Sequence, residues 1–249
     1  MAGDGAKRAS LTVFALAMAF AEAAVVVYLR KIYYPQGFCF PLAPVSAGII
    51  SVEILRETAT IFMIAFVAYI AGNKFYIRLA YFLFVFGLWD IFYYIFLKAL
   101  LGWPSSFLTW DILFLIPVAW LAPVLPPIIC SLTMILMSML ILRAERISRS
   151  THLNFREWGL VISGSTAIFI TFIFDVSGIV ISGGFLRSYF SLPANEDFIS
   201  AVSSFVPSSY NWSLFAAGEA LILAGLFLFY RKIKSYIATS EEIPQKIQG

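Results

Sequence analysis

The chain has 249 residues, of which 61% are hydrophobic and 12% charged, with 17 Lys and Arg against 14 Asp and Glu. Soluble domains have roughly 45–50% apolar and 25% charged residues, so this composition excludes a water-soluble fold. The net charge of +3 is scattered over loops, and we expect no nucleic-acid partner. A membrane span needs about 20 apolar residues, so the length predicts a single membrane domain, 1–249, with six or seven spans.

Six apolar stretches predict an all-α bundle of transmembrane helices in contact with the lipid bilayer. They cover residues 9–29, 48–71, 79–97, 128–142, 159–182 and 213–230. The first stretch follows Lys7 and Arg8, as in a signal peptide, but its 21 residues exceed the roughly 7–15 of a signal core. We interpret it as an uncleaved first span.

The stretch 107–127 is apolar but carries prolines at positions 117, 123, 126 and 127. Proline kinks helices, and irregular backbone at membrane depth must be buried in protein or line a cavity. The stretch is therefore either a re-entrant half-helix or a short seventh span.

Lys and Arg of short loops collect on the cytoplasmic side. With six spans, both termini share one side with twelve of the sixteen basic residues outside the spans, whereas seven spans would put the termini on opposite sides and split these residues eleven to five. The count favours six spans and cytoplasmic termini.

Acidic residues inside the spans are costly and usually face the bundle interior or a wet cavity. With six spans, six acids fall at one level, roughly 8–14 Å below the outer surface of the hydrocarbon core. They are Glu22, Glu53, Glu57, Asp90, Asp175 and Glu219, and Asp111 would lie just above them. Convergent carboxyls can share protons, cations and water, so we expect one site rather than several.

The second span contains the triplet that we expect to carry catalysis together with Asp90. Offsets of three and four residues put Arg56 and Glu57 on the helix face of Glu53. Burial favours the neutral form of a carboxyl, whereas an acid beside an arginine stays ionised. We therefore expect Glu57 or Asp90 as the proton donor and Glu53 with Arg56 as its charged partner. The alternative is a buried ion pair that only fixes helix packing.

Substrate-binding groups are expected around these acids. The hydroxyls of Tyr93 and Tyr94 lie one turn beyond Asp90, and Glu22, Asp175 and Glu219 complete the set. The chain has 25 Phe and 12 Tyr. A cavity lined by such rings beside acids suits a long apolar substrate that develops positive charge. Gly218 and Gly225, seven residues apart beside Glu219, predict a close helix contact.

Metal and cofactor signals are weak in this sequence. The chain has one histidine, His152, and two cysteines, Cys39 and Cys130, which form no metal-ligand spacing. We therefore predict no metal site from these residues, although four or more converging carboxyls could hold a hard divalent cation. No motif identifies a cofactor.

Three stretches carry a resemblance to known sequences. They are VVVYLRKIYYPQGFCFPLAP, VEILRETATIFMIAF and FGLWDIFYYIFLKALLGWPSSFLTWDILFLIPVAWLAPVLPP, in the first half of the chain. Together they resemble a group of uncharacterised bacterial polytopic inner-membrane proteins. The resemblance implies a compact polytopic protein of a bacterial inner membrane and carries over no catalytic residue. Small polytopic terpene cyclases are similar only in size and in having intramembrane acids.

Three functions fit these observations. The first is an acid–base enzyme for a small lipid-soluble, isoprenoid-like substrate. The second is a non-catalytic subunit or assembly factor, whose charged residues would pair with other membrane subunits. The third is a proton- or cation-coupled transporter with the broken segment as its gate.

Overall fold

We describe a computed structural model of the chain that covers residues 2–147, 152–187, 192 and 195–247, with side chains described for residues 5–238 of these. The long helices are α1 (Ala2–Tyr33), α2 (Ala47–Ala71), α3 (Phe75–Leu101), α4 (Leu125–Ile147), α5 (Phe155–Ser182) and α7 (Trp212–Ile247). Between them lie two strands, β1 (Trp110–Phe114) and β2 (Trp120–Pro123), and the short helix α6 (Glu196–Ser204).

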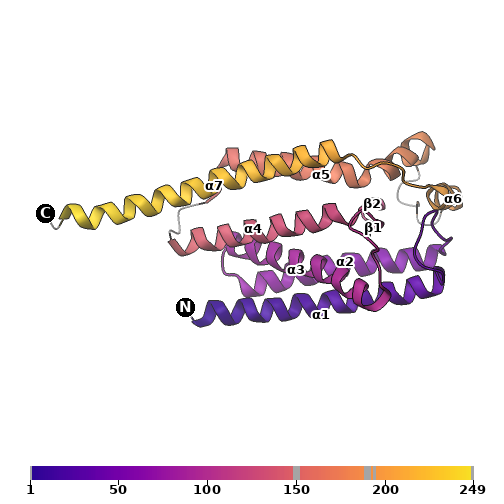
Figure 1. Cartoon of the computed structure of the whole chain (residues 1–249), viewed down its shortest axis with the longest axis horizontal. Helices are drawn as coiled ribbons and strands as arrows, with labels where there is room; N and C mark the ends of the chain where they lie inside the picture. The colour runs from indigo at the N-terminus through magenta and orange to yellow at the C-terminus, as the bar shows by residue number, and fades with distance from the viewer. Residues whose placement is uncertain (1, 148–151, 188–191, 193–194, 248–249) are drawn as a thin grey trace.

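Each of the six predicted spans lies within one long helix, and all six helices are long and apolar enough to cross a membrane. The protein is thus an all-α polytopic membrane protein. Successive long helices run in opposite directions, and both chain ends lie at the same end of the bundle (Figure 1). We call this the terminal end, and the end that holds the strands and α6 the distal end.

The helices form two groups with separate apolar cores. In one group α3 packs against α1 and α2, around buried residues such as Ala15, Ile64 and Val85. In the other α5 packs along α7, and α4 lies against α7 around Leu226 and Phe229. Because α3 also packs against α4, this contact joins the groups.

Close backbone contact holds the second group together. A Cβ atom added to Gly218 would lie 2.8 Å from the carbonyl oxygen of Gly164, and one added to Gly225 would lie 3.1 Å from the carbonyl oxygen of Glu157. The predicted close contact at Gly218 and Gly225 is therefore confirmed, with α5 as the partner helix.

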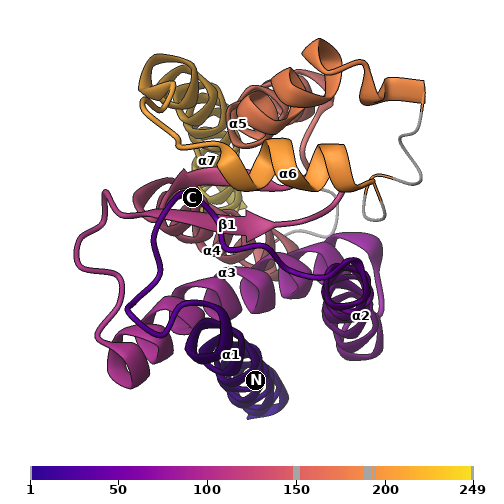
Figure 2. The ribbon, with the colours of Figure 1, turned by 90° about the vertical axis from the view of Figure 1, so that its right-hand side faces the viewer.

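The proline-rich stretch is neither a half-helix nor a seventh span. It forms an antiparallel hairpin in which Trp110 faces Pro123 and Phe114 faces Trp120, with a bulge between Ile112 and Phe114. A hairpin satisfies its backbone donors and acceptors by pairing, so it can lie among helices where an unpaired chain could not. Figure 2 shows it at the distal end between the two helix groups, with α6 crossing beside it.

The prolines explain why the chain turns here instead of forming a helix. Pro117 lies between the strands, and Pro123 ends β2. Pro126 and Pro127 lie in the first turn of α4, where the backbone N–H groups have no helical partner to lose. The fourth span therefore begins at Leu125, three residues before the predicted start.

We predict that Gly164→Ala lowers the free energy of unfolding by about 1–3 kcal/mol. The added methyl group would press on the carbonyl of Gly218 and the side chain of Ile222. The control is Gly178→Ala on the same helix, where an added Cβ has no atom within 4 Å and stability should not fall. Thermal unfolding in detergent compares the two variants, and equal losses would contradict the close contact.

Candidate functional site

A cavity of about 450 Å³ lies at the distal end of the bundle. Its walls come from α1, the 34–45 connection, α2, α3, the hairpin and α6, and most of the lining side chains are apolar. The charged residues among the lining are Glu22, Arg30, Glu53, Arg56, Glu57, Asp90 and Asp111. The structure thus brings together, around one cavity, all four residues predicted to carry catalysis.

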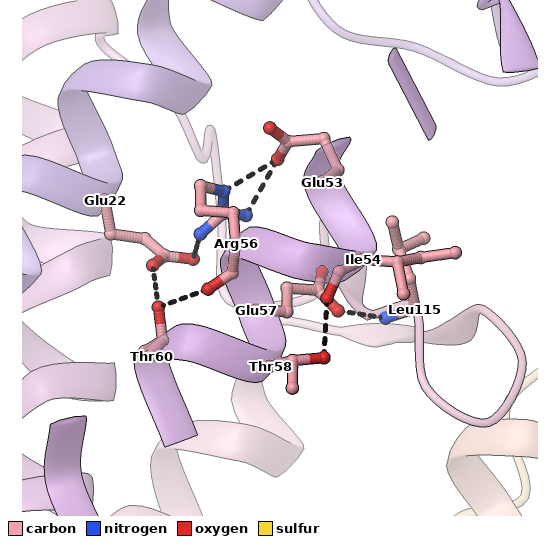
Figure 3. Close-up of polar contacts among 8 residues, drawn as sticks. All are labelled: Glu22, Glu53, Ile54, Arg56, Glu57, Thr58, Thr60 and Leu115. Carbon is pink, nitrogen blue, oxygen red and sulfur yellow. Dashed lines mark hydrogen bonds and ion pairs between the residues drawn. The ribbon is translucent and has the colours of Figure 1, made fainter. Parts of the chain in front are cut away.

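Arg56 holds the first charged cluster, which joins α1 to α2. Its Nη1 lies 2.5 Å from Glu22 Oε1, and its Nε and Nη2 lie 2.9 and 2.8 Å from Glu53 Oε2. The hydroxyl of Thr60 donates to the Arg56 carbonyl oxygen at 3.0 Å. Figure 3 shows the guanidinium between the two carboxylates. One cation is therefore shared by two acids inside the membrane domain.

Glu57 lies apart from the Arg56 ion pairs and contacts the hairpin. The partners of Arg56 are Glu53 and Glu22, whereas the Oε2 atom of Glu57 accepts a hydrogen bond from the Leu115 N–H at 2.8 Å. Adjacent residues on a helix diverge by about 100°, so Glu57 points away from its neighbour Arg56 and toward the hairpin (Figure 3). Its side chain is buried.

Asp90 is a second acid of the lining whose hydrogen-bond donor is a neutral group. Its Oδ2 accepts a hydrogen bond from the Ser131 hydroxyl on α4 at 2.7 Å. Tyr93 and Tyr94, which are predicted to bind substrate, also line the cavity. The hydroxyl of Tyr94, however, donates to Asp111 Oδ2 at 3.3 Å. The Tyr94 hydroxyl therefore bonds the hairpin acid Asp111, whereas the donor to Asp90 comes from α4.

Arg30 and Asp111 form an ion pair that the sequence does not predict. The Nη2 atom of Arg30 lies 2.7 Å from Asp111 Oδ1, with side-chain exposures of 9% and 1%. The Arg30 guanidinium also lies over the rings of Trp103 and Phe38, at 3.6 and 4.3 Å from their centroids. Burial raises the pKa of Asp111, and the charge of Arg30 acts in the opposite direction. The pair ties α1 to β1.

The sequence held a signal for this pair. Arg30 follows directly after the predicted first span, which places it in a loop, but α1 continues to Tyr33 and keeps Arg30 within the helix. The sequence predicts Asp111 just above the other acids. An arginine at the end of a span and an acid just inside the same membrane boundary are candidates for pairing.

Two predicted substrate-binding acids lie apart from the cavity lining. Glu219 on α7 is buried and accepts hydrogen bonds from the Thr133 hydroxyl at 3.2 and 3.3 Å. Asp175 on α5 is half-buried. Glu22, the third predicted binding acid, does line the cavity. Within the described ranges, no group of three or more His, Cys, Asp or Glu side chains is arranged to hold a metal ion.

The chain was compared with protein families, curated proteins and solved structures. No protein-family model, curated protein or solved structure matches the chain.

We predict that Arg30→Gln and Asp111→Asn each lower the free energy of unfolding by about 3–5 kcal/mol, because each leaves a buried charge without its partner. The double variant should lose less than the sum of the two. Lys31→Gln, an exposed neighbour with the same charge change, is the control and should unfold like the native chain. Strictly additive losses would show that the two residues do not interact.

Proposed function

We propose that this protein is an acid–base enzyme that acts on a lipid-soluble, isoprenoid-like substrate in the distal cavity. The observation that supports the proposal is the lining itself, in which Glu57 and Asp90 face the same mostly apolar space as the arginine-paired acids. A volume of about 450 Å³ lies within the range of about 300–1,000 Å³ for small-molecule sites.

The two kinds of acid suggest a division of roles. Glu57 and Asp90 are held by a backbone N–H and a hydroxyl, contacts that a neutral carboxyl can also accept. Either is our candidate for the proton donor. Glu22 and Glu53 instead share the positive charge of Arg56. They would stabilise a cation that forms on the substrate, together with the rings of Tyr93 and Tyr94.

The apolar lining suggests how the substrate would be held. Residues such as Ile50 and Ile54 of α2, Leu115 of the hairpin and Val202 of α6 line the same cavity. A hydrocarbon chain placed against them would leave water and gain apolar burial. The exclusion of water would also protect a cationic intermediate from hydrolysis.

A second candidate is a non-catalytic subunit or assembly factor. It is favoured by the fact that both arginines of the cavity join separate elements, Arg56 linking α2 to α1 and Arg30 linking α1 to β1. Ion pairs of this kind also occur as purely structural contacts. Under this hypothesis the acids fix the bundle, and neutral substitutions should change stability but no metabolite.

We predict that cells in which the native chain is replaced by Glu57→Gln or Asp90→Asn lose one lipid-soluble product and accumulate its precursor. A neutral amide cannot donate the required proton, so we expect a rate at least 100-fold lower. The measurement is mass spectrometry of lipid and isoprenoid extracts. Glu219→Gln is the matched control, since Glu219 is a buried acid outside the cavity lining.

The result of this experiment separates the candidate functions. If Glu57→Gln, Asp90→Asn and the deletion all leave the extract unchanged while the protein is present in normal amount, the enzyme proposal is wrong. Co-purification with a fixed membrane partner would then support the subunit hypothesis. Ion flux in proteoliposomes that depends on Glu57 would support a transporter.

We also propose that the protein lies in a bacterial inner membrane with its terminal end in the cytoplasm. This rests on the resemblance of the first half of the chain and on the excess of Lys and Arg at the terminal end, which positive-inside topology predicts. Arg30, Lys31, Lys98 and Arg187 are the four basic residues assigned to the opposite side.

Cys39 provides a test of this orientation. It is exposed in the connection between α1 and α2 at the distal end, whereas Cys130 lies half-buried in α4. A membrane-impermeant thiol reagent should label the native chain in intact spheroplasts, and Cys39→Ser should abolish the label. Labelling confined to inverted vesicles would mean that the termini lie outside.

A further inference from the structure

A second concave surface lies at the terminal end, far from the distal cavity. It is a groove lined by residues of α1 and α4 with Phe84 of α3 between them. We call it the basic groove, because Arg8, Arg143 and Arg146 line it and, among the side chains described for residues 5–238, no acidic one does. The function proposed above makes no use of these residues.

Helix periodicity explains why the groove forms here. On α1 the lining residues Gly5, Arg8 and Thr12 follow at intervals of three and four, and therefore share one face. Gly5 and Thr12 are small, which leaves open space around Arg8. Arg143 and Arg146 lie on one face of α4 in the same way. Since α3 packs against both helices, it forms the floor of the groove.

The basic groove continues into an apolar stripe along α4. Leu132, Leu136 and Met139 precede Arg143 at intervals of four, three and four residues, so the four side chains lie on one face of the helix. All three apolar side chains are exposed in the isolated chain, between 42% and 56%. A cationic end and an apolar track thus run in line, from the membrane boundary toward the membrane interior.

We propose that the basic groove binds the phosphate of a phospholipid with a net negative headgroup, and that one acyl chain of this lipid lies along Leu132, Leu136 and Met139. Guanidinium groups form paired hydrogen bonds with phosphate oxygens. Basic pockets between helices at a membrane boundary suit anionic headgroups. A zwitterionic headgroup would bring its own cation toward the arginines, so the charge of the groove favours a net negative lipid.

The test compares lipid binding to the intact protein in nanodiscs of phosphatidylcholine with and without phosphatidylglycerol. We expect phosphatidylglycerol to raise Tm and to stay bound in native mass spectrometry. In Arg8→Gln/Arg143→Gln the affinity should fall roughly tenfold or more, since each basic contact near a membrane surface contributes about a factor of five. Arg8→Lys/Arg143→Lys keeps the charge and should restore much of the binding.

The matched control is Arg231→Gln/Lys234→Gln, which removes two exposed charges from the same end of the bundle but outside the groove. It should bind phosphatidylglycerol like the native chain. The proposal is overturned if this control loses as much affinity as the groove variant, or if the native chain shows no preference for phosphatidylglycerol. It is also overturned if inorganic phosphate alone gives the same rise in Tm, because the acyl track would then contribute nothing.

Discussion

The pairing of β1 with β2 is the interaction on which the distal end depends. In lipid, backbone donors and acceptors must be satisfied within the protein, and a proline-broken chain cannot satisfy them as a helix. The hairpin does so by its own ladder, extended by Val124 N–H donating to the Thr109 carbonyl oxygen. The hairpin can therefore lie between the two helix groups (Figure 2) and form a non-helical wall of the cavity. Without it, the Leu115 N–H would not reach Glu57, and Asp111 would not face Arg30.

The charges around the cavity divide by what they contact. Arg56 and Arg30 each join two elements, and their acidic partners compensate charges that would be costly to bury alone. Glu57 and Asp90 have neutral donors instead. A bundle that needed only packing could use apolar residues at these two positions at lower cost. The presence of acids there is the reason for placing the proposed chemistry at Glu57 and Asp90.

The sequence predicts the spans well because hydropathy is a local property, and each of the six stretches lies in one helix. It does not predict partners that depend on long-range packing. Spacing within α2 predicts the pair of Glu53 with Arg56, but not that Glu22 of α1 is the second acid on this arginine. Depth alone grouped Glu219 with the cavity acids, although α7 belongs to the other helix group. The hairpin was missed because its strands are short, and pairing across a proline turn leaves little periodicity in the sequence.

The separate cores of the two helix groups have a consequence for biosynthesis. A chain emerges from its N-terminus first, so α1, α2 and α3 can assemble around Ile64 and Val85 before the rest is made. The hairpin comes next, but β2 packs against α5, which is synthesised later. The cavity wall contributed by α6 follows later still. The cavity is thus closed only near the end of translation, and a chain that stops after α4 would expose Glu57 and Asp90 without their enclosure.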